Sequence, residues 1–127
     1  MVVGVGVDMV EVERIRSALE DAKTGRRFRD RVYTEKEIQY CERRQRKYES
    51  YAGRFAAKEA VMKALGTGRR GVRWRDIEVV RERGRAPRVR LHGTALARAN
   101  FLGIDELAVS LSHSREYAVA LVLGEYR

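Results

Sequence analysis

The N-terminal segment of the chain alternates between valine and residues that are small or acidic. Residues 3–8 run Val-Gly-Val-Gly-Val-Asp. Neighbouring side chains of a β-strand point to opposite faces, so this strand has a valine face and a second face that is almost without side chains. Asp8 ends the bare face. The glycines beside it leave room for a ligand to approach the backbone, which makes the Asp8 carboxylate a candidate functional group.

The helix expected after this strand gives Asp8 a second interpretation. Val12, Ile15 and Leu19 recur at helical spacing, which predicts a helix that begins near Val10. Aspartate is preferred at helix N-termini, because its side chain accepts a hydrogen bond from a free backbone N–H. For an isolated aspartate this capping role is the more common one.

Two further helices are expected in the middle of the chain. Thr34 and Glu37 have the spacing of a capping box, which predicts a polar helix over residues 35–49. A third helix is expected over residues 50–65, and the glycines that follow it suit its end.

The second half of the chain combines alternating segments with one helix. The expected strands cover residues 77–81, 88–91, 107–112 and 117–123. A helix is expected over residues 94–103, with Leu96, Ala99 and Phe101 on or near its buried side. Helices that segregate from such strands predict the α+β class, with a mostly antiparallel sheet packed with helices. A length of 127 residues predicts a single domain, residues 1–127.

The composition indicates an acidic partner. The chain has 27 Lys and Arg against 18 Asp and Glu, a net charge of +9. At physiological salt this charge acts over about 8 Å and would attract nucleic acid, a membrane surface, an acidic protein or a phosphorylated small molecule. The single cysteine, Cys41, cannot form an internal disulfide, and the N-terminus lacks the features of a signal peptide or a membrane span. We therefore expect a cytoplasmic protein.

Charged residues interrupt the third helix, where residues 53–68 have the sequence GRFAAKEAVMKALGTG. Lys58 projects from the apolar side of this helix, and Glu59 lies at the edge of that side. Glu59 and Lys63 have i,i+4 spacing, so one interpretation is an exposed salt bridge worth about 0.2–0.5 kcal/mol. The other interpretation is that a poorly solvated carboxylate on an apolar helix needs partners or a metal.

Asp8 and Glu59 together would suit Mg²⁺. This ion usually takes one or two protein carboxylates and completes its octahedron with water and phosphate oxygens. Arg54, Lys58 and Lys63 add positive charge along the helix that carries Glu59. Carboxylates that hold a cation, beside lysines that neutralise further oxygens, are suited to pyrophosphate.

Three segments in order resemble a known family across nearly the full chain. GVGVDMVEVERI, RFAAKEAVMKALGTG and VSLSHSREYAVA are similar to segments of the holo-[acyl-carrier-protein] synthases, the small bacterial type of 4′-phosphopantetheinyl transferase. The resemblance implies the 4′-phosphopantetheinyl transferase fold. It also implies Mg²⁺-dependent transfer of 4′-phosphopantetheine from coenzyme A to a serine of apo-acyl carrier protein, releasing adenosine 3′,5′-bisphosphate, in support of fatty acid biosynthesis.

The resemblance assigns roles to individual residues. It makes Asp8 and Glu59 the metal ligands and Lys63 the residue that assists the leaving group. Either Glu59 or a metal-bound water would accept the serine proton. The positions that match the coenzyme A site are Arg54, Lys58, Lys63, Gly66 and His113. From the residues alone, His113 could equally be a turn histidine satisfied by the backbone.

The resemblance also implies two kinds of protein partner. One is the chain itself, as a homotrimer with active sites at subunit interfaces, where Asp8 and Glu59 come from one copy and some coenzyme A contacts from the next. The other is an acidic acyl carrier protein, which docks on the first helix. The matching docking positions are Arg14, Arg26, Arg27 and Phe28. Neither nucleic acid nor a membrane is an expected partner.

Two other functions are compatible with the residues. RRFRDR and GTGRRGVRWR, with the net charge, would suit a nucleic-acid-binding module. That module predicts stacking aromatics among the basic residues and gives no role to Asp8 and Glu59 together. A non-catalytic coenzyme A or nucleotide sensor would keep the phosphate site without turnover.

Overall fold

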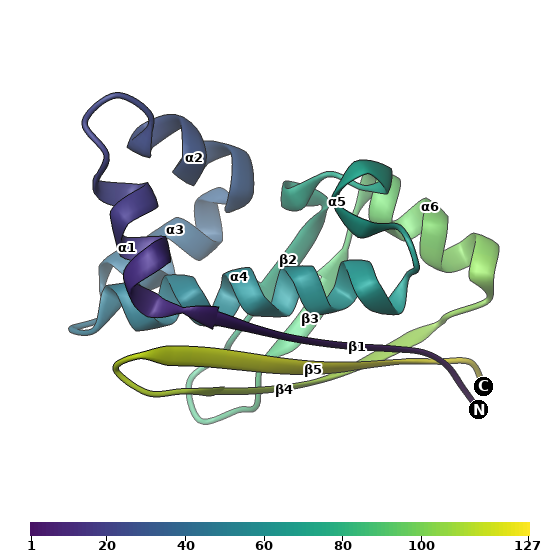
Figure 1. The fold of residues 1–127 in the computed structure, drawn as a ribbon. Coiled ribbons are helices and arrows are strands. Elements are labelled where there is room, and N and C mark those ends of the chain that lie inside the picture. Colours follow the sequence, from purple (N-terminus) through teal and green to yellow (C-terminus); the bar gives the residue numbers. More distant parts are fainter.

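A long helix, α4 (Lys47–Ala64), lies across one face of a three-stranded antiparallel sheet (Figure 1). The computed structural model describes residues 1–127. The strand order of the sheet is β1–β5–β4, so β5 is central. Its strands are β1 (Val2–Glu11), β4 (Glu106–His113) and β5 (Tyr117–Glu125).

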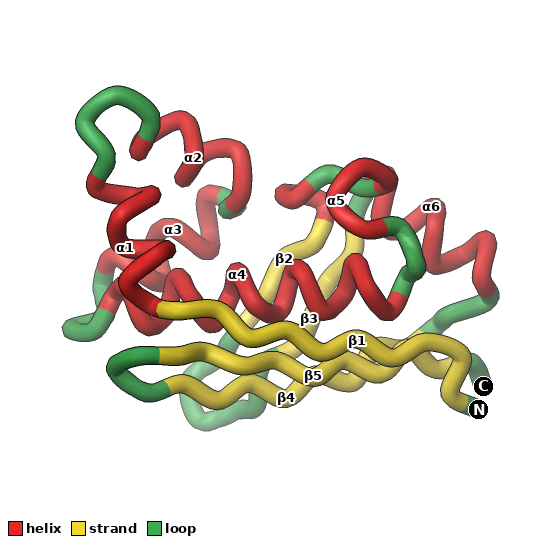
Figure 2. Tube along the Cα trace, in the orientation of Figure 1, coloured by secondary structure: helices red, strands yellow, loops and turns green.

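The other elements surround α4. The helices that precede it are α1 (Val12–Glu20), α2 (Gly25–Val32) and α3 (Glu35–Glu42). The elements between α4 and β4 are α5 (Gly68–Gly71), the 3₁₀ helix η1 (Trp74–Asp76), β2 (Ile77–Val80), β3 (Arg88–Leu91) and α6 (Gly93–Leu102). Strands β2 and β3 form a second antiparallel sheet, and the helices lie on one side of the three-stranded sheet (Figure 2). The predicted α+β class with antiparallel strands is confirmed.

The glycines of β1 allow this strand to pass very close to α4. A Cβ atom at Gly6 would lie 1.8 Å from the Ala60 carbonyl oxygen, and one at Gly4 would lie 2.2 Å from the Ala64 carbonyl oxygen. No side chain fits at such distances. The bare face of β1 is therefore covered by α4, and the expectation that its glycines leave room for a ligand is wrong.

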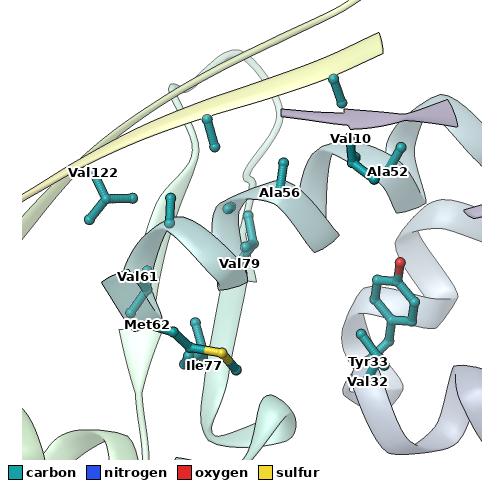
Figure 3. Packing of buried hydrophobic residues seen from close by; sticks show 14 of the residues in the cluster. Val10, Val32, Tyr33, Ala52, Ala56, Val61, Met62, Ile77, Val79 and Val122 are labelled. Atoms are coloured by element: carbon teal, nitrogen blue, oxygen red, sulfur yellow. The ribbon is translucent and has the colours of Figure 1, made fainter. Parts of the chain in front are cut away.

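Alanines of α4 face the sheet, and larger side chains fill the space on other sides of the helix. Ala52 is fully buried beside Val10 of β1 (Figure 3). Met62 is buried beside Ile77 of β2 (Figure 3). These residues belong to one hydrophobic cluster that also includes Tyr33 at the end of α2. Burial on several sides fixes the position of α4, the helix that carries Arg54, Lys58, Glu59 and Lys63.

The face of the three-stranded sheet that points away from α4 is apolar and exposed. Val3, Val5 and Val7 of β1 have exposed fractions of 46%, 56% and 54%. Val119 and Leu121 of the central strand β5 are also exposed. The valine face predicted for residues 3–8 is confirmed, and this chain does not cover it.

The helix predicted over residues 35–49 is two helices in the structure. Its capping box is confirmed, because the Glu37 N–H donates to Thr34 Oγ1 at 3.2 Å and the Thr34 N–H donates to Glu37 Oε1 at 2.8 Å. The helix ends at Glu42, however, and α4 begins after a turn at residues 43–46. Those four residues are all polar, so their hydrophobic pattern gave no sign that the helix axis changes.

Other boundaries differ less. Strand β1 continues to Glu11, so α1 begins later than expected, and the polar helix α2 was not predicted. The predicted strands agree with the observed ones to within two residues at each end. On α6, Ala95 and Ala99 are buried, whereas Leu96 and Phe101 are exposed. The expectation for those two large residues is wrong because α6 packs through its alanines. No helix combines the length and the apolar character needed to cross a membrane.

Candidate active site

The Asp8 carboxylate lies where β1 crosses α4 and is paired with Lys63. Lys63 Nζ donates to Asp8 Oδ1 at 3.1 Å and to the Val7 carbonyl oxygen at 2.9 Å. The Asp8 side chain is 13% exposed. Asp8 is a strand residue, and the residue at the N-cap of α1 is Glu11, which makes no side-chain capping bond. The capping interpretation of Asp8 is therefore wrong.

Glu59 lies one helical turn before Lys63 on the same side of α4. Its carboxylate is paired with the guanidinium of Arg69, which belongs to α5. Lys63 forms its ion pair with Asp8 rather than with Glu59, so the interpretation of Glu59 and Lys63 as an i,i+4 salt bridge is wrong. The Asp8 and Glu59 carboxylates lie on the same side of the crossing of β1 and α4, and each forms an ion pair with one cation.

Asp8, Glu59 and Lys63 form what we call the carboxylate cluster. Gly66 follows it along the chain, with a positive φ of 71° and its N–H donated to the Lys63 carbonyl oxygen. No group of three His, Cys, Asp or Glu side chains is placed to hold a metal ion. A metal at Asp8 and Glu59 would thus take its other ligands from water or substrate, as Mg²⁺ commonly does.

Lys58 is not part of this cluster. It is fully buried, and its Nζ lies 2.6 Å from Glu37 Oε1. It also donates to the carbonyl oxygens of Ile77 at 2.6 Å and Trp74 at 3.1 Å. Burial lowers the pKa of this ammonium, and the nearby Glu37 carboxylate opposes that shift. All three donors of Lys58 therefore have protein acceptors, so no donor is left for coenzyme A in this structure, and its place in the coenzyme A site stays a prediction.

Arg54 lines a basic cavity of about 1170 Å³. The Arg54 guanidinium carbon lies 4.0 Å from the centre of the Tyr40 ring. Arg54 is only 5% exposed, yet its Nε has no hydrogen-bond partner, and its Nη1 makes one long bond of 3.4 Å to the Ser50 carbonyl oxygen. A buried donor without an acceptor is costly unless a ligand supplies one. Further basic residues that line the cavity are Arg43, Arg44, Arg46, Arg81 and Arg83.

His113 lines the same cavity at the end of β4. Its Nδ1 lies 2.9 Å from Glu49 Oε1, while Nε2 has no protein partner. Glu49 is nearly buried on α4 and lies 3.9 Å from the Arg46 guanidinium. The interpretation of His113 as a turn histidine satisfied by the backbone is wrong, because a carboxylate orients its ring.

The predicted site residues therefore form two groups that α4 separates. Five positions along an α-helix correspond to a rotation of about 140°, so Arg54 and Glu59 leave α4 in nearly opposite directions. His113 accompanies Arg54, whereas Asp8 and Lys63 accompany Glu59. The two groups therefore lie on different sides of α4.

The residues predicted to dock a carrier protein lie on α1 and α2. Arg14, Arg26 and Arg27 are exposed, and no acidic side chain pairs with them. Phe28 is half-buried, with its ring centroid 6.2 Å from that of Phe55 and 6.3 Å from that of Tyr33. Its packing holds α2 against α4, and the arginines beside it remain available to a partner.

Three residues around the two groups were not predicted from the sequence. Tyr40 contacts Arg54, Glu49 contacts His113, and Arg69 pairs with Glu59. For Tyr40 the sequence held one signal, its i,i+4 spacing to Arg44, which is typical of side chains in contact on a helix. In the structure the Arg44 guanidinium carbon lies 5.4 Å from the centre of the Tyr40 ring. Arg69 gave no such signal, because its contact depends on how the chain turns after α4.

The fold described above and the match of the sequence to a family model define a class of protein. The chain belongs to the 4′-phosphopantetheinyl transferase superfamily, whose family model matches residues 4–122.

Within that class, the chain is similar to holo-[acyl-carrier-protein] synthases. The synthase of Solibacter usitatus is 48% identical over 126 residues, which cover 98% of this chain and 99% of the relative. A crystal structure of the Bacillus anthracis synthase, in complex with CoA (3′,5′-ADP), is 35% identical with a TM-score of 0.80 and covers 100% of this chain and 99% of its own. A crystal structure of the Neisseria meningitidis synthase is 32% identical with a TM-score of 0.83, and the match covers 98% of this chain and 99% of that synthase.

Proposed function

We propose that the protein transfers the 4′-phosphopantetheine group from coenzyme A to a serine of apo-acyl carrier protein. The reaction releases adenosine 3′,5′-bisphosphate and supplies holo-carrier protein for fatty acid biosynthesis. Family membership supports this function, as do relatives that match the chain nearly from end to end. The structural observation that carries the proposal is the buried Arg54 without an acceptor in a basic cavity, because a coenzyme A phosphate supplies that acceptor.

Asp8 and Glu59 would hold Mg²⁺. Their chemistry fits, since two carboxylates without a third protein ligand leave positions for water and phosphate oxygens. When bound by these two carboxylates, Mg²⁺ would supply positive charge that neutralises the pyrophosphate of coenzyme A and polarises the attacked phosphorus. Lys63, held beside Asp8, supplies positive charge for the leaving phosphate, and Glu59 is the candidate acceptor for the serine proton.

Coenzyme A would be held by two copies of the chain in a homotrimer. Arg54 and His113 of one copy would bind its phosphates, and the carboxylate cluster of the next copy would face the pyrophosphate, with Gly66 allowing close backbone approach. The separation of the two groups by α4 supports this arrangement. The exposed apolar face of β1 and β5 supports assembly, because such faces are normally buried against a partner.

The acyl carrier protein would dock on α1 and α2. Arg14, Arg26 and Arg27 have no acidic partner within the chain, and the net charge of +9 favours encounter with an acidic protein. We place Phe28 at the edge of this surface. A cytoplasmic location is part of the proposal, since the one cysteine is buried and free.

Mass spectrometry of an apo-carrier protein tests the proposed reaction. Incubation with this protein, coenzyme A and Mg²⁺ should add about 340 Da, the mass of a phosphopantetheinyl group attached through phosphate. Chelation of the metal and the Glu59→Gln substitution should each abolish the gain, whereas Glu35→Gln, at an exposed residue of α3, should leave it unchanged. The absence of any gain with wild-type protein would refute the reaction for that carrier. Full activity of Glu59→Gln would remove Glu59 from the metal site.

A further inference from the structure

Each carboxylate of the candidate metal site is paired with a cation of the same chain. Asp8 is paired with Lys63, which is anchored on α4 and also bonded to the Val7 carbonyl oxygen. Glu59 is paired with Arg69, which reaches it from a different element, α5. The two cations differ in the element that carries them: Lys63 belongs to α4 at its crossing with β1, whereas Arg69 belongs to α5, outside that crossing.

The Arg69 pair is built so that it can open. Its side chain is 63% exposed, although that of Glu59 is 13% exposed. Gly66 and Gly68 both have positive φ values, 71° and 60°, and α5 itself is only four residues long. An exposed arginine of such a segment loses little packing when it moves, and ion pairs of this kind are weak.

The indole of Trp74 also lies near the Arg69 guanidinium. The guanidinium carbon is 5.7 Å from the ring centre, a distance at which a cation is attracted to the ring face. Trp74 in turn stacks on Phe55, with centroids 5.0 Å apart, and Phe55 lies one turn before Glu59 on α4. The guanidinium thus contacts both a carboxylate and the only tryptophan of the chain.

We propose that Arg69 is the resident counter-ion of Glu59 in the metal-free protein, and that a divalent cation at Asp8 and Glu59 displaces it from the carboxylate. The inference rests on the proposed metal role of these two residues. A guanidinium and a divalent cation on the same carboxylate repel each other at a few ångströms, and this repulsion favours departure of Arg69, the exposed and loosely attached cation. Arg69 therefore keeps Glu59 paired while no metal is bound, and it lowers the apparent affinity for the metal.

Metal affinity and tryptophan fluorescence test this competition without measuring activity. MgCl₂ is titrated into the full chain at constant ionic strength, with binding measured by calorimetry and Trp74 emission recorded in parallel. In the wild type, departure of the guanidinium from the indole should give a saturable emission change. In Arg69→Gln that change should be absent, and Mg²⁺ should bind about fivefold more tightly, because the competing pair is gone.

Arg70→Gln is the matched control, since Arg70 is the exposed neighbour of Arg69 on the same segment and has no ion pair. It should behave as the wild type in both measurements. Equal Mg²⁺ affinity and equal emission changes in Arg69→Gln and the wild type would overturn the role of Arg69 alone. If Glu59→Gln binds Mg²⁺ as tightly as the wild type, the metal assignment itself fails, and this inference fails with it.

Discussion

Lys58 and Glu59 are neighbours in sequence, but the structure gives them different environments. Lys58 forms a fully buried ion pair with Glu37, while Glu59 lies at the edge of the β1–α4 crossing. The helical pattern correctly placed a charge on the apolar side of the helix. It could not reveal Glu37 as the partner, because that residue belongs to a separate helix, α3. The charge pattern of the helix and the family resemblance both placed Lys58 beside phosphate, whereas in the structure its ammonium is bonded within the protein.

Removal of the Lys58 ammonium should destabilise the protein. Lys58→Met leaves the Glu37 carboxylate buried without its counter-charge, which we expect to lower the free energy of unfolding by about 3 kcal/mol in urea titrations. Lys23→Met, at an exposed residue of the loop before α2, should change it by less than about 0.5 kcal/mol. Wild-type stability of Lys58→Met together with weakened coenzyme A binding would return Lys58 to the ligand site.

At the scale of elements, the sequence predicted strand β1 correctly but not which helix packs against it. The alternation over residues 3–8 identified the strand and its apolar face, because both are local properties of the chain. The element that covers the opposite face could not be identified in this way. Only the structure shows that the glycines allow α4 to approach, and that Asp8 and Lys63 meet as a result.

A pair of glycine substitutions tests this close packing. In Gly6→Ala the new methyl group would lie 1.8 Å from the Ala60 carbonyl oxygen, so β1 must shift, and we expect a loss of about 3 kcal/mol in the free energy of unfolding. Gly53→Ala places a methyl group on α4 where no atom lies within 4 Å apart from its chain neighbours and the nearby helix backbone, and it should stabilise the helix by up to about 1 kcal/mol. Thermal unfolding should thus show shifts of opposite sign. Unchanged stability of Gly6→Ala would contradict the β1–α4 contact.

At the scale of the whole molecule, the sequence named most residues of the site without showing where they meet. Motif positions carry chemical identity, so Asp8, Glu59 and Arg54 could be chosen before any fold was known. Their directions depend on how α4 is rotated against the sheet, which no single segment determines. The structure separates Arg54 from the two carboxylates, and this separation is the basis of the proposal that neighbouring copies share each site.

Subunit mixing tests the shared transferase site most directly. Arg54→Ala and Glu59→Gln should each be nearly inactive, since each removes one of the two groups from every site. If each site takes one group from each of two neighbouring copies, random co-assembly of equal amounts restores both groups at about a quarter of the sites. Mass spectrometry of the carrier protein should then show about a quarter of the wild-type rate of phosphopantetheine transfer. A mixture that is no more active than its parents would contradict the account.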